Sequence, residues 1–258
     1  MALDPTATAA GVGLVTHTAI DSTNAECLRL ARAGERGPLW VAAQIQTAGR
    51  GRRGRTWVSE PGNLFASLLM TDAGPPERLS ELCFVAGVSV YDAICDAIRA
   101  ARPDATLDQS GQLALKWPND VLLDGAKLCG ILIEGEGSAT VIGIGINCAS
   151  HPPAAAYPTT DLATAGFRVN PQDMLAALSA TMLRRLRQWD RGAGFANIRA
   201  DWLARAGGLG GRIAVALPGG VRAGLFETLD ARGGLVLHLD DGTRETITAG
   251  DVLAPRAA

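Results

Sequence analysis

The sequence predicts an α+β fold in which helices pack on a mixed, mainly antiparallel sheet, with a small β domain after it. Three strand-like segments between residues 113 and 146 are joined by short turns, which antiparallel pairing allows and parallel pairing does not. Apolar stripes at helical spacing over 76–101 and 170–189 predict two long helices that cover the sheet. A glycine-rich run at 207–211 then precedes short alternating segments, which predict a β-barrel of about fifty residues.

The N-terminal segment is small and polar at first, so we expect residues 1–11 to form a disordered tail. Residues 13–18 alternate like a strand. Thr23 with Glu26 three positions later forms a capping box, which opens a helix that stops at Gly34. The polar groups at this helix start either cap the helix alone or also face a small polar ligand: Ser22, Thr23 and Asn24.

A basic, glycine-rich loop at residues 46–57, the basic loop, lies between strands predicted at 39–46 and 64–70. Its glycines permit positive φ angles and close approach to a ligand, and its arginines supply planar donors for an anion. The glycine spacing matches a dinucleotide fingerprint, but residues 56–63 cannot open the helix that a Rossmann fold requires, so we reject that interpretation. The alternatives are a solvated surface loop and an arginine-glycine segment that binds nucleic acid.

Two lysines lie on either side of a polar turn in the next informative stretch. Lys116 is at the end of one predicted strand, and Lys127 begins another after a hairpin turn at residues 124–125, an Asp-Gly pair. Lysine is seldom buried unless it meets an anion, so the pair could face one site. Alternatively, both lysines are solvated residues of edge strands and residues 119–120 serve only the turn.

The composition excludes several classes of protein. Hydrophobic residues at 47%, charged residues at 19% and a net charge of −2 argue against a dedicated DNA-binding or membrane-surface protein. Five cysteines without a C-x-x-C motif and three scattered histidines predict neither a disulfide framework nor a metal site. No signal peptide or transmembrane helix is expected, which favours a cytoplasmic location with reduced thiols.

Four motifs follow one another along the chain: Gly-Arg-Gly-Arg-Arg-Gly-Arg-Thr-Trp (49–57), Lys-Trp-Pro-Asn-Asp (116–120), Lys-Leu-x-Gly-Ile-Leu-x-Glu (127–134) and Gly-Ile-Gly-Ile-Asn (143–147). Their order, with Ser-Thr-Asn upstream at 22–24, resembles that of the biotin protein ligases, and the resemblance extends over residues 12–254. Each motif alone is modest, but four in order are very specific. The resemblance implies a class II synthetase-like catalytic domain at 12–206 and an SH3-like domain at 207–258.

The resemblance also implies a reaction in two steps. Biotin and ATP would form biotinyl-5′-AMP with Mg²⁺, and a specific lysine in the biotin carboxyl carrier domain of a biotin-dependent carboxylase would then accept the biotin. Negative charge gathers on the phosphates, so preorganised cations are needed rather than a covalent nucleophile. Too few residues precede the first strand for the DNA-binding domain of some members, so no sequence-specific DNA binding is expected.

Site residues carried over from the family fall into three groups, and no protein ligand of a metal is predicted. The catalytic residues would be Arg50, Lys116 and Lys127. Biotin would be bound by Ser22, Thr23, Asn24, Gln46, Gly49, Arg50, Lys127 and Gly130. ATP and the adenylate would be bound by Arg52, Arg53, Arg55, Trp57, Asn119 and Asn147. Members of the family can pair through sheet edges, and the strand at 140–146 is a candidate for a homodimer contact.

Two other functions compete with the ligase. A lipoyl or octanoyl transferase of the same superfamily would use a lysine with a cysteine, and Cys129 lies two residues after Lys127, which places both on one face of a regular strand. The Lys-Trp-Pro-Asn-Asp motif and the C-terminal domain favour the biotin enzyme. A nucleic-acid-binding module would use the basic loop, but few aromatic residues and an acidic pI near 5.9 disfavour it.

Overall fold

The computed structural model describes residues 1–104, 112–153 and 157–253. A seven-stranded sheet has the order β1-β2-β3-β7-β6-β5-β4, in which β1 and β2 are parallel and all other neighbours are antiparallel. This is the predicted mixed, mainly antiparallel sheet. The strands are β1 Gly13–Ile20, β2 Leu39–Gln46, β3 Leu64–Thr71, β4 Leu113–Lys116, β5 Asp120–Leu123, β6 Ala126–Glu136 and β7 Ala139–Ile146.

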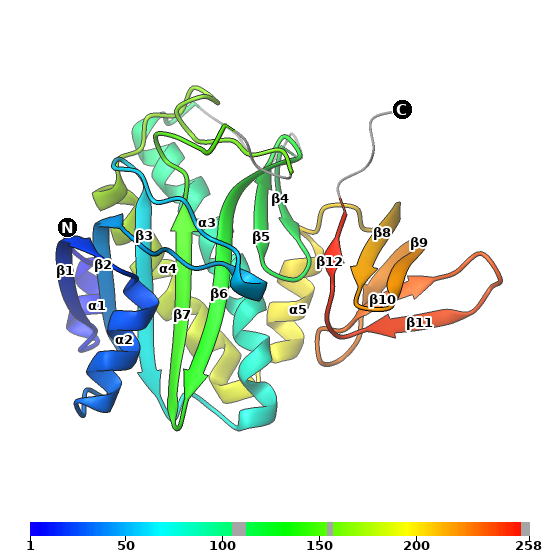
Figure 1. The fold of residues 1–258 in the computed structure, drawn as a ribbon, viewed down its shortest axis with the longest axis horizontal. Coiled ribbons are helices and arrows are strands. Elements are labelled where there is room, and N and C mark those ends of the chain that lie inside the picture. The colour runs from blue at the N-terminus through cyan, green and yellow to red at the C-terminus, as the bar shows by residue number, and fades with distance from the viewer. Residues whose placement is uncertain (105–111, 154–156, 254–258) are drawn as a thin grey trace.

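Helices cover both faces of this sheet (Figure 1). One face carries α2, and the other carries α3, α4 and α5, so the sheet lies between two layers. Their bounds are α2 Thr23–Arg32, α3 Leu82–Ala101, α4 Pro171–Trp189 and α5 Phe195–Leu203. The basic loop crosses the α2 face in front of β7 and β6.

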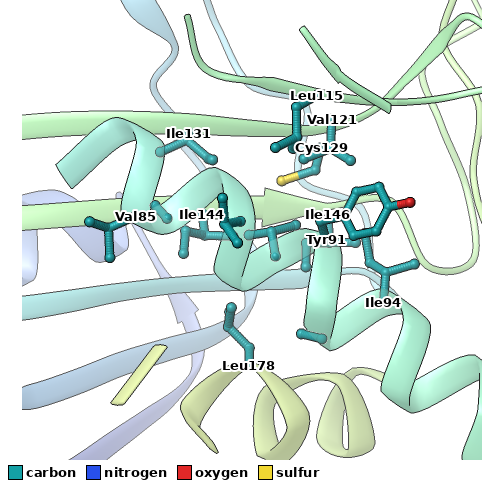
Figure 2. Close-up of a cluster of buried hydrophobic side chains, with 14 of the residues drawn as sticks. Val85, Tyr91, Ile94, Leu115, Val121, Cys129, Ile131, Ile144, Ile146 and Leu178 are labelled. Atoms are coloured by element: carbon teal, nitrogen blue, oxygen red, sulfur yellow. The ribbon is translucent and has the colours of Figure 1, made fainter. Parts of the chain in front are cut away.

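The core lies between the sheet and α3 to α5. Figure 2 shows Val85 and Ile94 of α3 packed with Ile131 and Ile144 of the central strands and with Leu178 of α4. All five side chains are buried. A second, smaller cluster joins α2 to the opposite face of β2, β3 and β7. Burial on both faces explains why β7 is a continuous apolar and glycine run rather than an alternating one.

A separate antiparallel sheet forms the C-terminal domain, with the order β11-β10-β9-β8-β12. Its strands are β8 Arg212–Leu217, β9 Gly220–Leu229, β10 Leu235–His238, β11 Arg244–Ile247 and β12 Asp251–Val252. The domain packs on the main sheet through the Trp117 indole, whose Nε1 donates to the Gly233 carbonyl at 3.0 Å. Four of the five strands are those that the sequence predicts, and the short β12 was missed.

The N-terminus differs from the disordered tail that we expected. Residues Pro5–Ala9 form the short helix α1, capped by the Asp4 side chain. Ala7 is fully buried, and the backbone N–H of Asp4 donates to Ser179 Oγ of α4 at 2.9 Å. Ala7, the partly buried Met1 and Leu3, and one polar anchor hold this segment, and none of them gives a periodic sequence signal.

Three smaller predictions need correction. The N-cap of α2 is Ser22, whose Oγ accepts from the Ala25 N–H, and not Thr23. The helix expected at 76–101 begins with a 3₁₀ turn at Pro76–Glu81. The strand proposed for a dimer edge, β7, is central in the sheet between β3 and β6, so its backbone hydrogen-bonding groups are already paired. Within the described part of the chain, no helix is long and apolar enough to cross a membrane.

Candidate active site

A cavity of about 1180 Å³ lies between the α2 face of the main sheet and the C-terminal domain. Most of the site residues that the sequence predicts line it: Ser22, Thr23, Asn24, Gln46, Arg50, Arg52, Arg55, Trp57, Lys116, Asn119, Lys127 and Gly130. These residues come from α2, the basic loop and strands β2, β4 and β6. The structure therefore brings together segments that are separated by up to a hundred positions in the chain.

One end of the cavity is neutral and polar. The Thr23 hydroxyl and its backbone N–H both donate to Gln46 Oε1, at 3.0 and 2.9 Å. The Ser67 hydroxyl lies 2.7 Å from Thr23 Oγ1 and 2.5 Å from Asn24 Oδ1, and Ser67 is fully buried. Gln46 also donates through Nε2 to Ser59 Oγ. These bonds fix the donors and acceptors that an uncharged polar ring would meet.

Glycines in the sheet let Asn24 and the Trp57 ring lie directly against the strands. A Cβ at Gly143 would lie 2.1 Å from Asn24 Oδ1, and one at Gly145 would lie 2.5 Å from the Trp57 ring. A Cβ at Gly130 on the neighbouring strand would also meet that ring, at 2.8 Å. Only glycine permits this approach, which explains the Gly-Ile-Gly pattern of β7 by packing rather than by turn formation.

The two lysines meet at one carboxylate. Lys127 Nζ lies 2.6 Å from Asp120 Oδ1, and Lys116 Nζ lies 3.7 Å from Asp120 Oδ2. Lys127 Nζ is also 5.5 and 5.2 Å from the ring centres of Trp57 and Tyr157. Desolvation by burial is the main cause that lowers the pKa of Lys116, with the Asp120 carboxylate opposing it. Lys116 does lie on an edge strand, β4, but the prediction that both lysines are solvated is wrong, because both line the cavity and neither side chain is more than 22% exposed.

Arg50 pairs with a carboxylate that also fixes the neutral end. Its Nη2 lies 3.0 Å from Glu134 Oε2, and the same oxygen accepts from Asn24 Nδ2 at 2.7 Å. Glu134 is the last residue of the Lys-Leu-x-Gly-Ile-Leu-x-Glu motif. One carboxylate thus couples the start of α2 to the first arginine of the basic loop.

The basic loop is a closed hairpin rather than an irregular segment, although Arg50, Arg53 and Arg55 are exposed. The Gly51 N–H donates to the Arg55 carbonyl at 2.6 Å, and the Trp57 N–H donates to the Gly49 carbonyl at 2.9 Å. A 3₁₀ turn at Arg52–Gly54 forms its tip. Arg52 Nη1 donates to Asn119 Oδ1 at 2.7 Å, which ties the tip to the Lys-Trp-Pro-Asn-Asp segment.

Three predicted site residues do not line the cavity: Gly49, Arg53 and Asn147. Gly49 lies behind it, where a Cβ would be 2.4 Å from the Trp57 carbonyl oxygen. Arg53 points to the C-terminal domain. The Asn147 side chain is buried and donates to the Thr160 carbonyl at 3.0 Å, so in this structure it supports the loop that carries Tyr157.

Cys129 does not share a face with Lys127, contrary to the geometry that a transferase would need. The pairing of β5 with β6 shifts between Val121 and Leu122, and this bulge brings Lys127 to the cavity side together with Gly130. Cys129 instead packs in the core with Ile131 and Val121 (Figure 2). Burial raises the pKa of its thiol well above the usual range, which makes it a poor nucleophile.

Sequence reasoning missed five residues that shape the site: Ser67, Asp120, Glu134, Tyr157 and Asp251. Asp120 and Glu134 lie inside the motifs and could have been found by asking which carboxylates balance the cations. Ser67 is an isolated polar residue in an apolar strand, a pattern that often marks a buried hydrogen bond. Tyr157 and Asp251 come from loop and edge segments whose position only the tertiary structure gives.

Comparison with known proteins identifies the class of this fold as that of ligases for biotin or lipoate. The model of the "Biotin/lipoate A/B protein ligase family" matches residues 17–150, and the model of the "Biotin protein ligase C terminal domain" matches residues 208–253. The biotin–[acetyl-CoA-carboxylase] ligase of Paracoccus denitrificans is 41% identical over 90% of this chain and 96% of its own length. The ligase of the same name from Mycobacterium tuberculosis is 34% identical over 90% of this chain and 85% of its own length.

Solved structures agree. The biotin protein ligase from Aquifex aeolicus in complex with biotin and ATP has a TM-score of 0.79 and 24% identity, covers 95% of this chain and 99% of its own, and so supports the fold. The ligase from Leishmania major in complex with biotinyl-5-AMP has a TM-score of 0.65 and 25% identity, with coverage of 92% and 99%. The chain belongs to the biotin protein ligase family.

Proposed function

We propose that this protein activates biotin with ATP and transfers it to a lysine of a carrier domain. In the first step a biotin carboxylate oxygen attacks the α-phosphorus, the bond to the bridging oxygen breaks, and pyrophosphate leaves. In the second step the acceptor amine attacks the acyl carbon of the mixed anhydride, loses its proton and releases AMP. Both steps develop negative charge on phosphate oxygens, which fixed cations stabilise.

A single observation carries this proposal: one cavity joins a neutral, hydrogen-bonded end to a cluster of cations. The neutral end is built on Thr23, Asn24 and Gln46, and the cations include Lys116 and Lys127. An uncharged ring needs neutral donors and acceptors, whereas a carboxylate and phosphates need cations. Biotin and ATP together present those two chemistries.

The proposed roles follow the position of each side chain. Ser22, Thr23, Asn24 and Gln46 would bind the ureido ring, with Gly130 beside it in the cavity wall. A biotin contact by Gly49 stays a prediction, because Gly49 does not line the cavity. Arg50 and Lys127 would meet the biotin carboxylate and the α-phosphate, with Lys116 alongside. Arg52, Arg53 and Arg55 would bind or organise the phosphates, and Trp57 and Asn119 would contact adenine. An adenine contact by Asn147 stays a prediction, because its amide here holds the Thr160 carbonyl.

Mg²⁺ fits this site as an ion carried by the nucleotide. It is usually held by phosphate oxygens and water with one or two carboxylates, and it would neutralise charge on the leaving pyrophosphate. The cavity lining includes the carboxylates Asp120 and Asp251, and each is already paired with cations of the chain. The phosphates would therefore supply most of its ligands.

The names of the relatives indicate which protein would accept the biotin. Two of them are named biotin–[acetyl-CoA-carboxylase] ligases, so we propose that the acceptor is a biotin carboxyl carrier domain of such a carboxylase. Its lysine would have to reach the acyl carbon between the basic loop and the C-terminal domain. No observation favours a second function, because Cys129 is buried away from the cavity.

A labelling experiment tests the proposal. The purified protein is incubated with labelled biotin with and without Mg·ATP, and the products are separated into free adenylate and protein-bound label. We expect biotinyl-AMP and one equivalent of pyrophosphate only with ATP. An acyl thioester on Cys129 formed from an octanoyl donor without ATP would contradict the proposal and favour the transferase.

A further inference from the structure

A carboxylate of the C-terminal domain holds the tip of the basic loop. Asp251 of β12 lies within ion-pair distance of three arginines: Arg52 Nη1 at 3.4 Å, Arg53 Nη1 at 2.9 Å and Arg55 Nη2 at 3.1 Å. Arg52 Nη2 also donates to the Gly250 carbonyl at 3.4 Å. The tip is therefore anchored to a different domain from the one that carries the loop.

The three arginines need such an anchor. They lie within four consecutive positions at a turn where Arg53 has a φ of 56°, so their guanidinium groups are held close together and repel one another. Among the described residues, Asp251 is the only acidic side chain that forms an ion pair with any of them. Without it, we expect the tip to sample open positions.

The anchor is itself fixed in space. Asp251 pairs with Ala216 of β8, and the Leu253 N–H donates to the Ala214 carbonyl at 2.8 Å. These bonds join β12 to the C-terminal sheet, which the Trp117 indole in turn joins to the Lys-Trp-Pro-Asn-Asp segment. The carboxylate thus has a defined position relative to the lysines of the cavity.

The charge balance leaves the cluster ready for an anion. One carboxylate can neutralise one of three guanidinium groups, so the cluster keeps a net positive charge. Each arginine has five N–H donors, and a carboxylate cannot use them all. Arg52 and Arg55 also line the cavity. The spare donors and charge are therefore available where a polyphosphate would lie.

We propose that Asp251 is a positioning residue, which gathers Arg52, Arg53 and Arg55 at the cavity mouth and so prepares them to bind the nucleotide phosphates. This inference rests on the proposed function, since it names the phosphates of ATP as the ligand. It assigns to the C-terminal domain an indirect part in nucleotide binding, through the arginines of the basic loop. The opposite arrangement, in which Asp251 competes with phosphates for the arginines, predicts the opposite sign in the experiment below.

The first arm of the test uses no substrate. Trypsin cleaves after arginine, and the loop tip carries three target sites, so the initial rate of cleavage in the loop reports how well the tip is held. We expect Asp251→Asn to be cleaved several times faster than the unmodified protein. Glu227→Gln is the matched control, because Glu227 lies in the same domain and, within the described part of the chain, forms an ion pair only with Arg244. Equal cleavage of Asp251→Asn and the control would overturn the anchoring.

The second arm measures steady-state adenylate formation at varied ATP. Loss of preorganised, charge-assisted bonds should raise the KM for ATP about tenfold in Asp251→Asn and change kcat much less. Asp251→Glu should restore part of the affinity, which a merely structural role does not require. An unchanged or lower KM for ATP in Asp251→Asn would overturn the proposal, and a lower value would identify Asp251 as a competitor.

The two proposals fail in distinguishable ways. If the unmodified protein forms no adenylate from biotin and ATP, the proposed function is wrong. If it does so and Asp251→Asn has the same KM for ATP, only the inference about Asp251 is wrong. Asp251→Asn could also act by destabilising the fold, which would show as unfolding at a lower urea concentration than the unmodified protein. In that case Asp251→Glu decides between positioning and stability: a KM for ATP lower than that of Asp251→Asn at a similar kcat supports positioning, and an equal KM overturns it.

Discussion

Lys116 and Lys127 are the only lysines in this chain, which otherwise uses arginine for its cations. Both lie in one cavity and face one carboxylate, Asp120. Lysine carries a compact charge whose pKa responds to burial, whereas arginine offers a fixed fork of donors. Lysine at these two positions therefore fits a site in which each amine contacts one oxygen atom of a ligand at short distance.

Lys127→Ala should slow adenylate formation. The variant removes a charge-assisted bond to the reacting groups worth on the order of 1.5–3 kcal/mol, so the rate should fall roughly tenfold to a hundredfold or more. Pyrophosphate release measures the rate. Arg99→Ala, which removes an exposed cation of α3 that pairs with Asp96, is the control and should leave it unchanged. Release at a near-normal rate from Lys127→Ala would refute the assigned role.

The pH dependence of the reaction should report Lys116. Burial lowers its pKa from the ordinary 10.5, so the cation is lost at a lower pH than in the unfolded chain. Between the folded and unfolded pKa values of Lys116, the unfolded chain binds more protons, so the contribution of Lys116 to the free energy of unfolding rises with pH. Over the same pH range the folded protein loses the Lys116 cation, and with it the contribution of that cation to catalysis. We expect the alkaline limb of the pH–rate profile to lie below 10.5 and to move to higher pH in Lys116→Arg. A limb that stays in place would contradict a cationic role for Lys116.

At the scale of elements, β7 provides the surface on which the ligand would rest. In Gly143→Ala, the added methyl group would collide with Asn24 Oδ1, so the neutral end must shift. We expect calorimetry to show biotin binding at least about tenfold weaker, the cost of roughly one well-placed hydrogen bond. Gly219→Ala, where the new methyl group meets nothing within 4 Å, is the control. If Gly143→Ala binds biotin as tightly as Gly219→Ala, biotin does not bind at the neutral end of the cavity.

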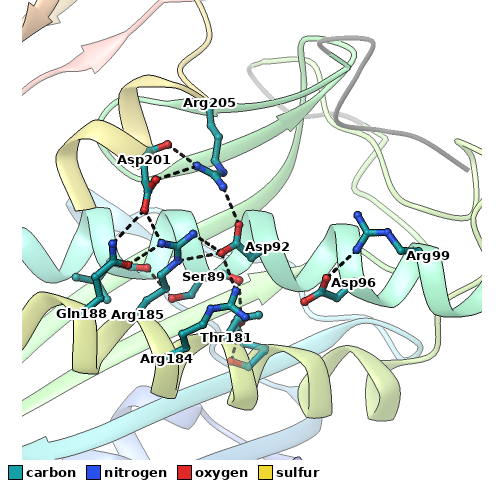
Figure 3. Close-up of polar contacts among 12 residues, drawn as sticks. Ser89, Asp92, Asp96, Arg99, Thr181, Arg184, Arg185, Gln188, Asp201 and Arg205 are labelled. Atoms are coloured by element: carbon teal, nitrogen blue, oxygen red, sulfur yellow. Dashed lines mark hydrogen bonds and ion pairs between the residues drawn. The ribbon is translucent and has the colours of Figure 1, made fainter. Parts of the chain in front are cut away.

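A buried ionic network joins the three helices behind the sheet. Asp92 of α3 pairs with Arg184 and Arg185 of α4 and with Arg205 beyond α5, and Asp201 joins the same network (Figure 3). The Asp92 side chain is only 11% exposed. The network holds the segment that leads into the C-terminal domain.

Asp92→Ala should lower the free energy of unfolding by about 2 kcal/mol, because it leaves the mostly buried guanidinium groups of Arg185 and Arg205 with only the more exposed Asp201 as a carboxylate partner. Asp96→Ala, one turn along α3, removes a carboxylate that is 48% exposed and should cost less than about 1 kcal/mol. Urea unfolding of both variants measures the difference. Similar losses for the two would show that the network contributes no more than a surface pair.

The elements were predictable where one local rule acts alone. The apolar content of residues 39–46 predicted β2 with the observed bounds, and Asp124-Gly125 predicted the hairpin between β5 and β6. The bulge in β6 was not predictable, because it depends on how β5 pairs. Its effect was large, because it placed Lys127 and Cys129 on opposite faces of the sheet, where a regular strand would have placed both on one face.

At the scale of the molecule, the glycine-rich run at 207–211 directly precedes the first strand of the second sheet, β8, and the change of composition there predicts a domain boundary. Which surfaces of the two domains meet was not predictable. Trp117 with Gly233, and Asp251 with the basic loop, are contacts across more than a hundred residues and have no local signature. Most of the candidate site, by contrast, was recognisable from the sequence, because its residues are concentrated in four ordered motifs.

Calorimetric titration of biotin, with and without a non-hydrolysable ATP analogue, tests most directly the claim that one cavity binds both substrates. We predict one biotin per chain in each case, and tighter binding when the analogue is present, because the phosphates would hold the basic loop closed over the biotin. If biotin does not bind, or if its affinity is the same with and without the ATP analogue, the claim that one cavity binds both substrates is contradicted.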